Sequence, residues 1–194
     1  MLERFFYVPS LYEHVPCANT FFEKEQPIFI EYCSGNGQWI EERAKCFPQI
    51  NWLAVEKRFD RARKIWLKSF KSALSNLFVA CAEGLTFTRY YAPKAAQIFI
   101  NFPDPWPKRR HAPNRLICPP FLEALATIVV PGGKTICTTD DPQYTSQMVK
   151  EFERSPLWKV CQNTTAPSDY GRSFFYDLWL EKGKTIHYLE FERC

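Results

Sequence analysis

Short apolar runs recur along the chain, and each is followed by a polar or glycine-containing turn. The first, PIFIEYC at residues 27–33, has the length of a buried strand and leads into the turn SGNG at residues 34–37. Runs of the same kind predict four further strands, over residues 51–56, 76–83, 96–102 and 134–140.

Between these runs, apolar residues recur at helical spacing. They predict helices over residues 38–47, 57–73, 119–130 and 141–155. The second helix is amphipathic, with Phe59, Trp66 and Phe70 on one stripe. Its other stripe is basic and contains Lys57, Arg61, Lys64, Lys68 and Lys71. We favour a solvated helix face over an RNA track for this basic stripe.

The tail contains three further strand-like segments, over residues 157–163, 173–181 and 184–192. The last two are expected to form a hairpin across Lys182 and Gly183. Strands that alternate with helices predict an α/β fold, with a parallel sheet covered on both faces and closed by an antiparallel pair. Ligands of such sheets bind beyond the carboxyl ends of the strands. The positions to inspect are therefore 33–37, 56, 83, 101–106 and 139–141.

Composition places the chain among globular proteins. Its 194 residues, 46% of them hydrophobic and 24% charged, suit one domain over residues 1–194. No apolar run approaches the roughly 18 residues of a membrane span, and the N-terminus lacks a signal-peptide layout, so we expect a cytoplasmic protein without a membrane partner. Eight scattered cysteines without a CxxC pair, and only three histidines, predict reduced thiols and no metal site.

The net charge of +4 is modest, but its distribution indicates a polyanionic partner. Residues 108–115 hold four Lys or Arg and one histidine with no acid, directly after a segment rich in proline. A solvated basic loop is the alternative. The proline-rich segment, NFPDPWP at residues 101–107, restricts the backbone around Asp104. Trp106 either closes the core, which we favour, or stacks on a base.

The first turn has features of a nucleotide site. Gly35 and Gly37 allow a close approach of the backbone to a ligand, although Ile40 stands where a dinucleotide fingerprint has its third glycine. Glu56 ends the second strand, where an acid typically accepts hydrogen bonds from ribose hydroxyls. A plain tight turn and a solvated acid are the alternatives.

Two more acids belong to this group. Glu31 lies inside the first apolar run, and a buried carboxylate requires a cationic partner or a raised pKa. That partner is either a ligand or a Lys or Arg of the protein. Glu83 ends the third strand and is placed to reach a base edge, or is simply a loop acid.

Together these residues resemble class I S-adenosylmethionine-dependent methyltransferases. The segment NFPDPWPKRRHAPNR, with PGG and TTD downstream, closely resembles the bacterial tRNA (guanine-N7-)-methyltransferase family over roughly residues 27–192. The resemblance implies a Rossmann-like, mostly parallel seven-stranded sheet with a C-terminal antiparallel hairpin. It also implies methyl transfer from S-adenosyl-L-methionine to a guanosine in the variable loop of tRNA (position 46), by a monomer or homodimer without a metal.

The resemblance also implies the roles of single residues. Asp104 is the implied catalytic acid. The implied cofactor-binding residues are Glu31, Gly35, Gly37, Glu56, Glu83 and Asp104. The implied substrate- or RNA-binding residues are Lys108, the segment from Arg110 to Arg115, Asp140, Ser173 and Tyr176.

Two positions depart from the family pattern. Cys33 replaces a common glycine, and Tyr176 replaces the glutamate of a Thr-x-Tyr-Glu motif, with Asp177 one position later. In a strand, Asp177 would face the opposite side and could not replace that glutamate. These departures keep open a tRNA-binding homologue with reduced or lost catalysis. A small-molecule methyltransferase and a nicotinamide dehydrogenase are disfavoured, by the basic segment and by the missing glycine.

Overall fold

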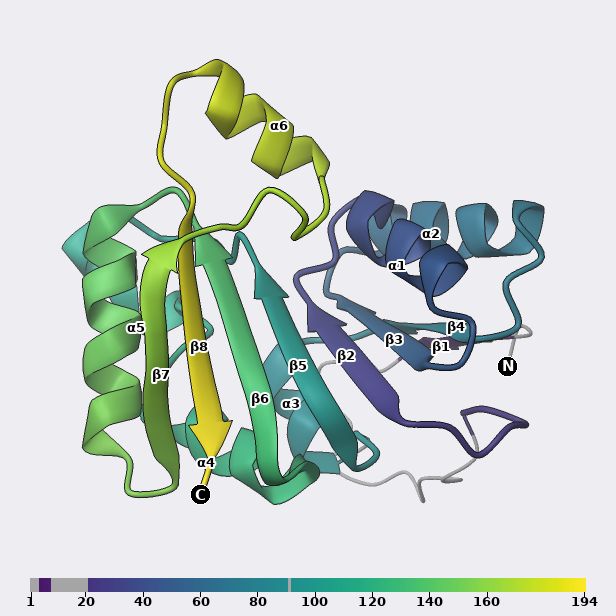
Figure 1. The fold of residues 1–194 in the computed structure, drawn as a ribbon, viewed down its shortest axis with the longest axis horizontal. Helices are drawn as coiled ribbons and strands as arrows, with labels where there is room; N and C mark the ends of the chain where they lie inside the picture. The colour runs from purple at the N-terminus through teal and green to yellow at the C-terminus, as the bar shows by residue number, and fades with distance from the viewer. Residues whose placement is uncertain (1–3, 8–20, 91) are drawn as a thin grey trace.

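The computed structural model describes residues 4–7, 21–90 and 92–194, which build one eight-stranded sheet (Figure 1). The strand order is β1-β4-β3-β2-β5-β6-β8-β7. The strands are β1 (Phe5–Tyr7), β2 (Ile28–Tyr32), β3 (Asn51–Glu56), β4 (Leu77–Cys81), β5 (Ala95–Asn101), β6 (Val129–Thr139), β7 (Trp158–Thr165) and β8 (His187–Arg193). The first six are parallel, and β8 runs antiparallel to β6 and β7.

The five predicted parallel strands are confirmed, and the sheet has one strand more than the expected seven. The additional strand, β1, pairs with β4 at the edge of the sheet. Three residues are too few to show a period of two, so the sequence pattern gave no signal for it.

Helices cover both faces of the sheet. They are α1 (Gln38–Cys46), α2 (Phe59–Lys71), α3 (Gly84–Tyr90), α4 (Pro119–Ile128), α5 (Pro142–Arg154) and α6 (Phe174–Glu181), with a 3-10 helix η1 (Arg109–Asn114). Apolar side chains of α3, α4 and α5 pack on one face, and those of α1 and α2 pack on the other. The four helices expected from apolar spacing are confirmed, with small differences at their ends.

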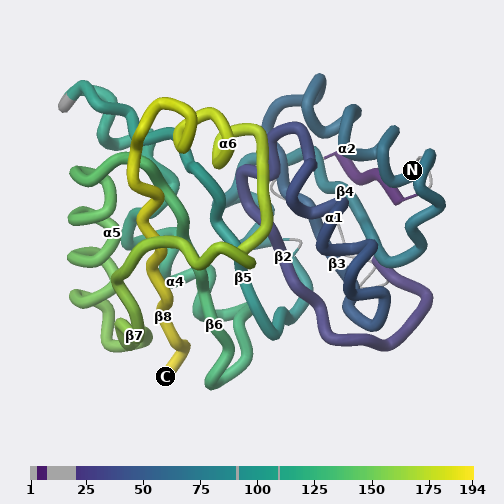
Figure 2. The backbone as a smooth tube through the Cα atoms, turned by 45° about the horizontal axis from the view of Figure 1, so that its top comes forward, coloured from purple at the N-terminus to yellow at the C-terminus, as the bar shows by residue number. Residues whose placement is uncertain are grey.

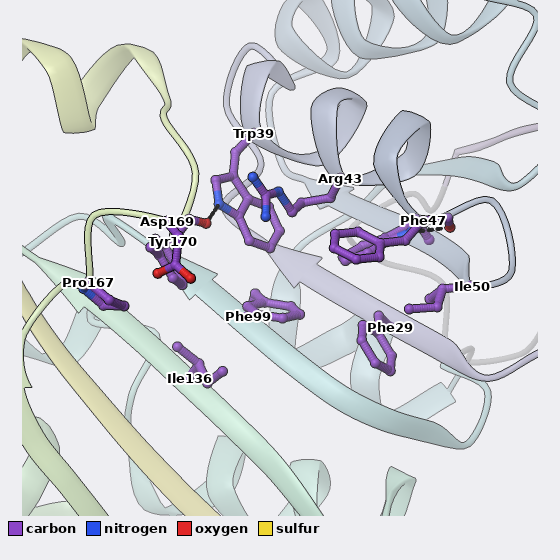
Figure 3. Close-up of a pocket in the computed structure, with 11 residues that line it drawn as sticks. Phe29, Trp39, Arg43, Phe47, Ile50, Phe99, Ile136, Pro167, Asp169 and Tyr170 are labelled. Atoms are coloured by element: carbon purple, nitrogen blue, oxygen red, sulfur yellow. Dashed lines mark hydrogen bonds between the residues drawn. The ribbon is translucent and has the colours of Figure 1, made fainter.

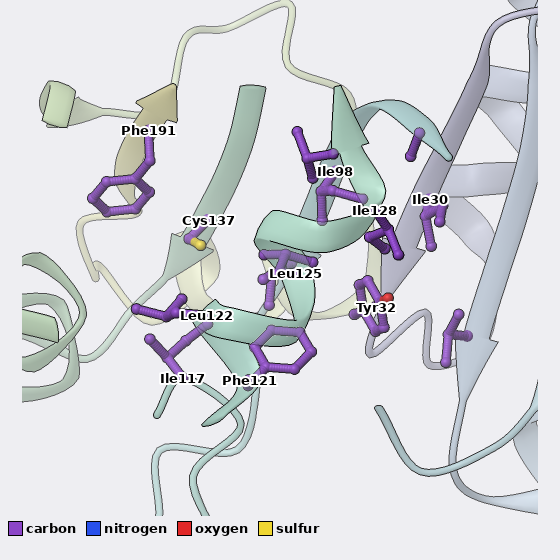
Figure 4. Packing of buried hydrophobic residues seen from close by; sticks show 14 of the residues in the cluster. Ile30, Tyr32, Ile98, Ile117, Phe121, Leu122, Leu125, Ile128, Cys137 and Phe191 are labelled. Atoms are coloured by element: carbon purple, nitrogen blue, oxygen red, sulfur yellow. The ribbon is translucent and has the colours of Figure 1, made fainter. Parts of the chain in front are cut away.

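The core under α4 shows why these helices pack where they do (Figure 4). Phe121, Leu122 and Leu125 project from α4 toward the sheet, and the Phe121 ring meets Tyr32 of β2 edge to face at 5.4 Å. The Tyr32 hydroxyl lies 2.6 Å from the hydroxyl of Thr88, so its polar end is satisfied inside the core. This packing fixes the end of β2, from which the first turn leaves.

The strand predicted over residues 173–181 is wrong, because this segment forms α6. The Ser173 side chain accepts a hydrogen bond from the backbone N–H of Tyr176 at 3.2 Å and so starts a helix. The aromatic content of this segment resembles a strand, but the place beside β8 is taken by β7. The closing antiparallel pair is therefore β7 and β8, and the hairpin across Lys182 and Gly183 does not form.

As a consequence, α6 lies beyond the carboxyl ends of the parallel strands. Figure 1 shows it past the arrowheads of β5 and β6, and Figure 2 shows it between α5 and α1. We call residues 166–173, which connect β7 to α6, the strap. The strap and α6 close over the edge of the sheet where ligands are expected.

No helix in residues 4–7, 21–90 and 92–194 combines the length and the apolar character needed to cross a bilayer. Within the same residues, no three His, Cys, Asp or Glu side chains gather closely enough to hold a metal ion. The cysteines of this part of the chain are free thiols.

Candidate active site

The turn after β2 is held by Glu56. Its carboxylate accepts hydrogen bonds from the backbone N–H groups of Gly35 and Arg58, each at 2.8 Å. Gly35 and Gly37 have positive φ angles of 55° and 70°, which glycine adopts without strain. A side chain at Gly37 would come within 2.7 Å of Ile65, so this glycine also lets α1 approach α2. Burial raises the pKa of Glu56, while the two N–H donors oppose that shift.

Cys33 follows β2 with a φ of 60°, in the left-handed region. Such a conformation costs a non-glycine residue about 1–2 kcal/mol. Cysteine in place of the family's glycine therefore introduces backbone strain at this turn. Burial raises the pKa of the Cys33 thiol, and the nearby carboxylates of Glu56, Asp104 and Glu31 add to the shift. Three of the predicted acids therefore lie close enough to Cys33 to act on its thiol.

Glu31 is buried, with 1% of its surface exposed. One of its carboxylate oxygens accepts a hydrogen bond from the Asn101 amide at 2.7 Å, and the other has no partner among the described residues. Burial raises the pKa of Glu31 to about 7, although the Asn101 hydrogen bond opposes this shift. An acid that is buried, half-satisfied and close to ionisation at neutral pH is suited to a cationic ligand group.

Asn101 is a residue that the sequence reasoning missed. Its amide oxygen accepts hydrogen bonds from the hydroxyls of Tyr170 at 2.5 Å and Thr138 at 3.0 Å. These two donors fix which end of the amide is the oxygen, so the NH2 group must face Glu31. Asn101 could have been noticed as the polar residue that follows the apolar residues 98–100 of β5. Tyr170 lies 69 residues away, and no pattern in the sequence indicated that it pairs with Asn101.

A narrow cleft opens beside Glu31. It is lined by Glu31, Cys33, Ser34, Gly35, Asn36, Gln38, Trp39, Asn101, Phe102, Ser173, Phe174 and Phe175. Phe175 of α6 lies over the first turn, with its ring 6.3 Å from that of Phe102 and the Arg61 guanidinium 6.0 Å from its centre. The first turn of α6 thus forms one wall of the cleft.

Glu83 has a local structural role. Its two carboxylate oxygens accept hydrogen bonds from the backbone N–H groups of Leu85 at 3.1 Å and Thr86 at 2.8 Å. It therefore caps α3, and it is not among the residues that line the cleft. The predicted contact between Glu83 and a ligand remains a prediction.

Asp104 stands in the loop after β5. Pro103 is buried and anchors the loop, while the Asp104 side chain is exposed. Phe102 and Trp106, on either side, have positive φ angles of 48° and 43°, which bulky residues rarely adopt. Strained residues of this kind persist only where their surroundings hold them, and they cluster at functional sites. Trp106 is half-buried and meets His111 edge to face at 5.6 Å.

The predicted RNA-facing residues divide into two groups. Lys108 and Arg110 are exposed at the start of η1, with the Arg110 side chain 3.2 Å from His111. Arg115 instead turns inward, and its guanidinium donates to the backbone oxygens of Pro105 at 2.6 Å and Trp106 at 3.3 Å. Basic residues of one sequence run therefore have different surroundings.

Asp140, Ser173 and Tyr176 lie near α6. Asp140 forms an ion pair with Lys184, whose ammonium stands 4.0 Å above the Trp179 ring. Ser173 lines the cleft and caps α6, whereas Tyr176 is buried against the sheet. Asp177 pairs with Arg172 at 2.5 Å. Because residues 174–181 form a helix, the expectation that Asp177 faces the opposite side of a strand no longer applies.

A second hollow lies on the sheet face beside α1 and does not contain the predicted site residues (Figure 3). Its floor and walls are mainly aromatic, and Trp39, Phe99 and Tyr170 lie close together there. The strap closes one side, where the Trp39 indole donates to the Tyr170 carbonyl at 2.9 Å. This hollow is separate from the three acids at the rim of the sheet.

Comparisons with known proteins agree with this geometry. Residues 25–186 match a family described as "Putative methyltransferase". A tRNA (guanine-N(7)-)-methyltransferase of Chlamydia abortus is 41% identical over 95% of this chain and 87% of its own. The enzyme of that name from Staphylococcus epidermidis is 36% identical over 93% and 87%. The chain belongs to the tRNA (guanine-N7-)-methyltransferase family.

Solved structures show that this methyltransferase shares the fold of other methyltransferases. The 16S rRNA methyltransferase KamB has a TM-score of 0.67 at 13% identity, over 87% of this chain and 88% of that one. TrmN from Thermus thermophilus has a TM-score of 0.65 at 16% identity, over 87% of this chain and 45% of that one. At these identities the likeness concerns the fold alone.

The residues of the methyltransferase fit its cofactor, S-adenosylmethionine. The unpaired oxygen of Glu31 suits the α-ammonium group of the methionine part, and Glu56 at the end of β3 suits the ribose hydroxyls. Gly35, which lines the cleft and has no side chain, suits a close approach of the cofactor to the first turn. Three carboxylates around Cys33 give this site a negative potential, which favours a cofactor that carries a sulfonium and an ammonium.

Proposed function

We propose that this protein transfers the methyl group of S-adenosylmethionine to N7 of a guanosine in the variable loop of tRNA, at position 46. The observation that carries the proposal is the place of Asp104. It follows the carboxyl end of β5, where its carboxylate adds with those of Glu31 and Glu56 to the raised pKa of the Cys33 thiol, and it precedes the exposed cations Lys108 and Arg110 in the chain.

The chemistry requires positioning and no proton transfer from the nucleophile. Guanine N7 has a lone pair and no proton, so it attacks the sulfonium methyl directly when N7, carbon and sulfur are in line. Positive charge moves from sulfur to the purine during the transfer. A carboxylate fixed near the purine stabilises that developing charge, and it also accepts hydrogen bonds from the N1–H and N2–H2 edge. We assign this role to Asp104.

RNA capture is assigned to the exposed cations of η1. We assign phosphate contacts beside the flipped guanosine to Lys108 and Arg110, and substrate contacts to Ser173, which lines the cleft, and to Asp140, which follows β6. In the free protein Asp140 is paired with Lys184. A contact between Asp140 and the substrate therefore requires that this exposed pair opens.

The double variant Lys108→Ala with Arg110→Ala should weaken tRNA binding roughly tenfold and lower the slope of log K against log salt by about 2, because two phosphate contacts are lost. Filter binding at several salt concentrations measures both quantities. The matched control is Lys150→Ala with Lys159→Ala, two exposed lysines on α5 and β7. An unchanged slope in the first variant would contradict the assignment.

The decisive experiment uses unmodified tRNA transcripts and S-adenosylmethionine labelled in its methyl group. We expect label in the wild-type tRNA, and none in a transcript whose variable-loop guanosine is replaced by 7-deazaguanosine, which lacks the N7 lone pair. A protein that shifts tRNA on a gel but transfers no label would be the catalytically inactive homologue. Label that persists in the 7-deaza transcript would refute N7 as the acceptor.

We further propose that residues 1–194 act as one domain in the cytoplasm, as a monomer or homodimer. The proposed substrate and the free thiols at the described cysteines agree with that compartment. Light scattering of the purified protein, with and without tRNA, distinguishes the two oligomeric states.

A further inference from the structure

The loop that carries Asp104 has few hydrogen bonds of its own. Pro103, Pro105 and Pro107 lack an N–H group, so three of the seven positions between β5 and η1 cannot donate to the rest of the protein. Its two flanking aromatic residues are held at positive φ. Rigid proline rings limit the shapes of the loop, but they do not attach it to the body of the protein.

Arg115 supplies that attachment. Its guanidinium donates from Nε to the Pro105 oxygen at 2.6 Å and from Nη2 to the Trp106 oxygen at 3.3 Å. These are the carbonyls one and two positions after Asp104. A planar guanidinium that grips two successive carbonyls fixes the orientation of both peptide groups, in a way that a single amine does not.

The other side of the same guanidinium is fixed to α5. Its Nη1 donates to the Gln147 side-chain oxygen, and its carbon lies 5.1 Å from the centre of the Tyr144 ring. Tyr144 is fully buried, and its hydroxyl accepts a hydrogen bond from the backbone N–H of Ile117 at 3.3 Å. Arg115 therefore connects the loop to α5 beside a buried and hydrogen-bonded tyrosine.

This arrangement differs from that of Lys108 and Arg110, which are exposed. All three nitrogens of the Arg115 guanidinium donate within the protein, to acceptors on the loop and on α5. Three of the five guanidinium N–H groups are thus engaged with the loop and with α5, which leaves two for any other acceptor. These hydrogen bonds favour a role for Arg115 inside the protein over a phosphate contact.

We infer that Arg115 is a positioning residue that holds the Asp104 loop in the geometry required for methyl transfer, and that it is not an RNA-binding residue. The inference rests on the proposed function, because Asp104 is catalytic only there. It predicts that substitution of Arg115 lowers turnover and leaves the affinity for tRNA unchanged.

The test compares Arg115→Ala and Arg115→Lys with Arg110→Ala. For both Arg115 variants we expect kcat at saturating tRNA and cofactor to fall about 100-fold, since misplacement of a catalytic group by 1 Å has effects of that size. Their tRNA Kd and salt slope should match wild type. Arg110→Ala should raise the tRNA Kd and lower the salt slope, with kcat at saturating tRNA unchanged. Arg154 is exposed at the far end of α5, and Arg154→Ala should match wild type in kcat, Kd and salt slope.

Methylguanidinium at low millimolar concentration should restore part of the turnover of Arg115→Ala, because it can occupy the vacated site, and should not affect Arg110→Ala. If Arg115→Ala does not fold, Arg115→Lys and Gln147→Leu are measured in its place. Both should lower kcat without a change in tRNA Kd, and the loss should be smaller for Gln147→Leu. A salt slope reduced by about 1 with unchanged kcat in an Arg115 variant would overturn the inference.

A readout that is independent of activity separates this inference from the proposed function. In protein labelled with 5-fluorotryptophan, the Trp106 resonance, assigned through Trp106→Phe, should shift or broaden in Arg115→Ala and stay unchanged in Arg154→Ala. If wild type does not methylate tRNA, the proposed function fails, while this measurement still shows whether Arg115 holds the Asp104 loop. An unperturbed Trp106 resonance in Arg115→Ala would refute that role of Arg115.

Discussion

Replacement of Asp104 by asparagine is expected to lower kcat by about 10²–10³-fold, the loss typical when a preorganised charge that stabilises a transition state is removed. Asparagine keeps the size of the side chain and one acceptor oxygen. It removes the negative charge that would balance the positive charge as it moves onto the purine. Because the Asp104 side chain is exposed, the free energy of unfolding should change little.

Single-turnover methyl transfer with labelled cofactor measures the chemical step directly, and filter binding should give a tRNA Kd close to that of wild type. The matched control is Asp169→Asn, which removes an exposed carboxylate from the strap, outside the cleft. Retained turnover in Asp104→Asn would remove Asp104 from the catalytic role. An equal loss in Asp169→Asn would show that the effect comes from net charge.

Replacement of Glu31 by glutamine is expected to weaken cofactor binding while making the free protein more stable. The carboxylate is buried and one oxygen is unpaired, so its ionised form is unfavourable until a cation arrives. Glutamine keeps the acceptor for the Asn101 amide and removes the charge. Loss of a charge-assisted hydrogen bond of this kind should raise the cofactor Kd about 100-fold.

The sign of the stability change follows from the pKa. The pKa of Glu31 is about 7 in the folded protein and 4.5 in the reference state, so between these pH values the folded protein holds the extra proton. The free energy of unfolding therefore falls as pH rises from about 4.5 to 7 and is lowest above pH 7. Glutamine removes this pH-dependent loss of stability, but it leaves an amide N–H unpaired. The free energy of unfolding of Glu31→Gln should therefore exceed that of wild type by about 2 kcal/mol at pH 8 and by little at pH 5.

Urea unfolding without cofactor, at pH 5 and pH 8, tests the stability change. Calorimetry in two buffers of different ionisation enthalpy tests the mechanism of binding. Near pH 6 the wild type should release a proton as the cofactor binds, because the ammonium group draws Glu31 into its ionised form, and Glu31→Gln should release none. Equal stability of the two proteins at pH 8 would show that Glu31 is already compensated by another charge.

Much of the site was predictable because its residues mark the ends of strands. Glu31 lies near the end of an apolar run, Glu56 ends one and Asp104 follows one, and parallel strands bring their carboxyl ends to one edge of the sheet. The glycines of the first turn were predictable for a similar local reason. Sequence position did not indicate the hydrogen-bond partners of single side chains. Glu83 caps α3 while its contact with a ligand stays a prediction, and Arg115 donates to the loop that precedes it.

Local pattern also failed where two secondary structures suit the same residues. Residues 173–181 have the aromatic content of a strand, and they form α6 because Ser173 caps them and β7 already occupies the edge of β8. That outcome depends on segments far apart in the chain. It places α6 and the strap over the cleft, and it brings Tyr170 to Asn101.

The sequence by itself determined the alternation of strands and helices, the proline-stiffened acid and the run of cations beside it, because these depend on neighbouring residues. The tertiary structure decided which acids lie near Cys33, which arginine forms hydrogen bonds with the Asp104 loop and which residues of α6 line the cleft. Those outcomes depend on contacts between residues tens of positions apart, and burial and competition for partners select them only when the chain is folded.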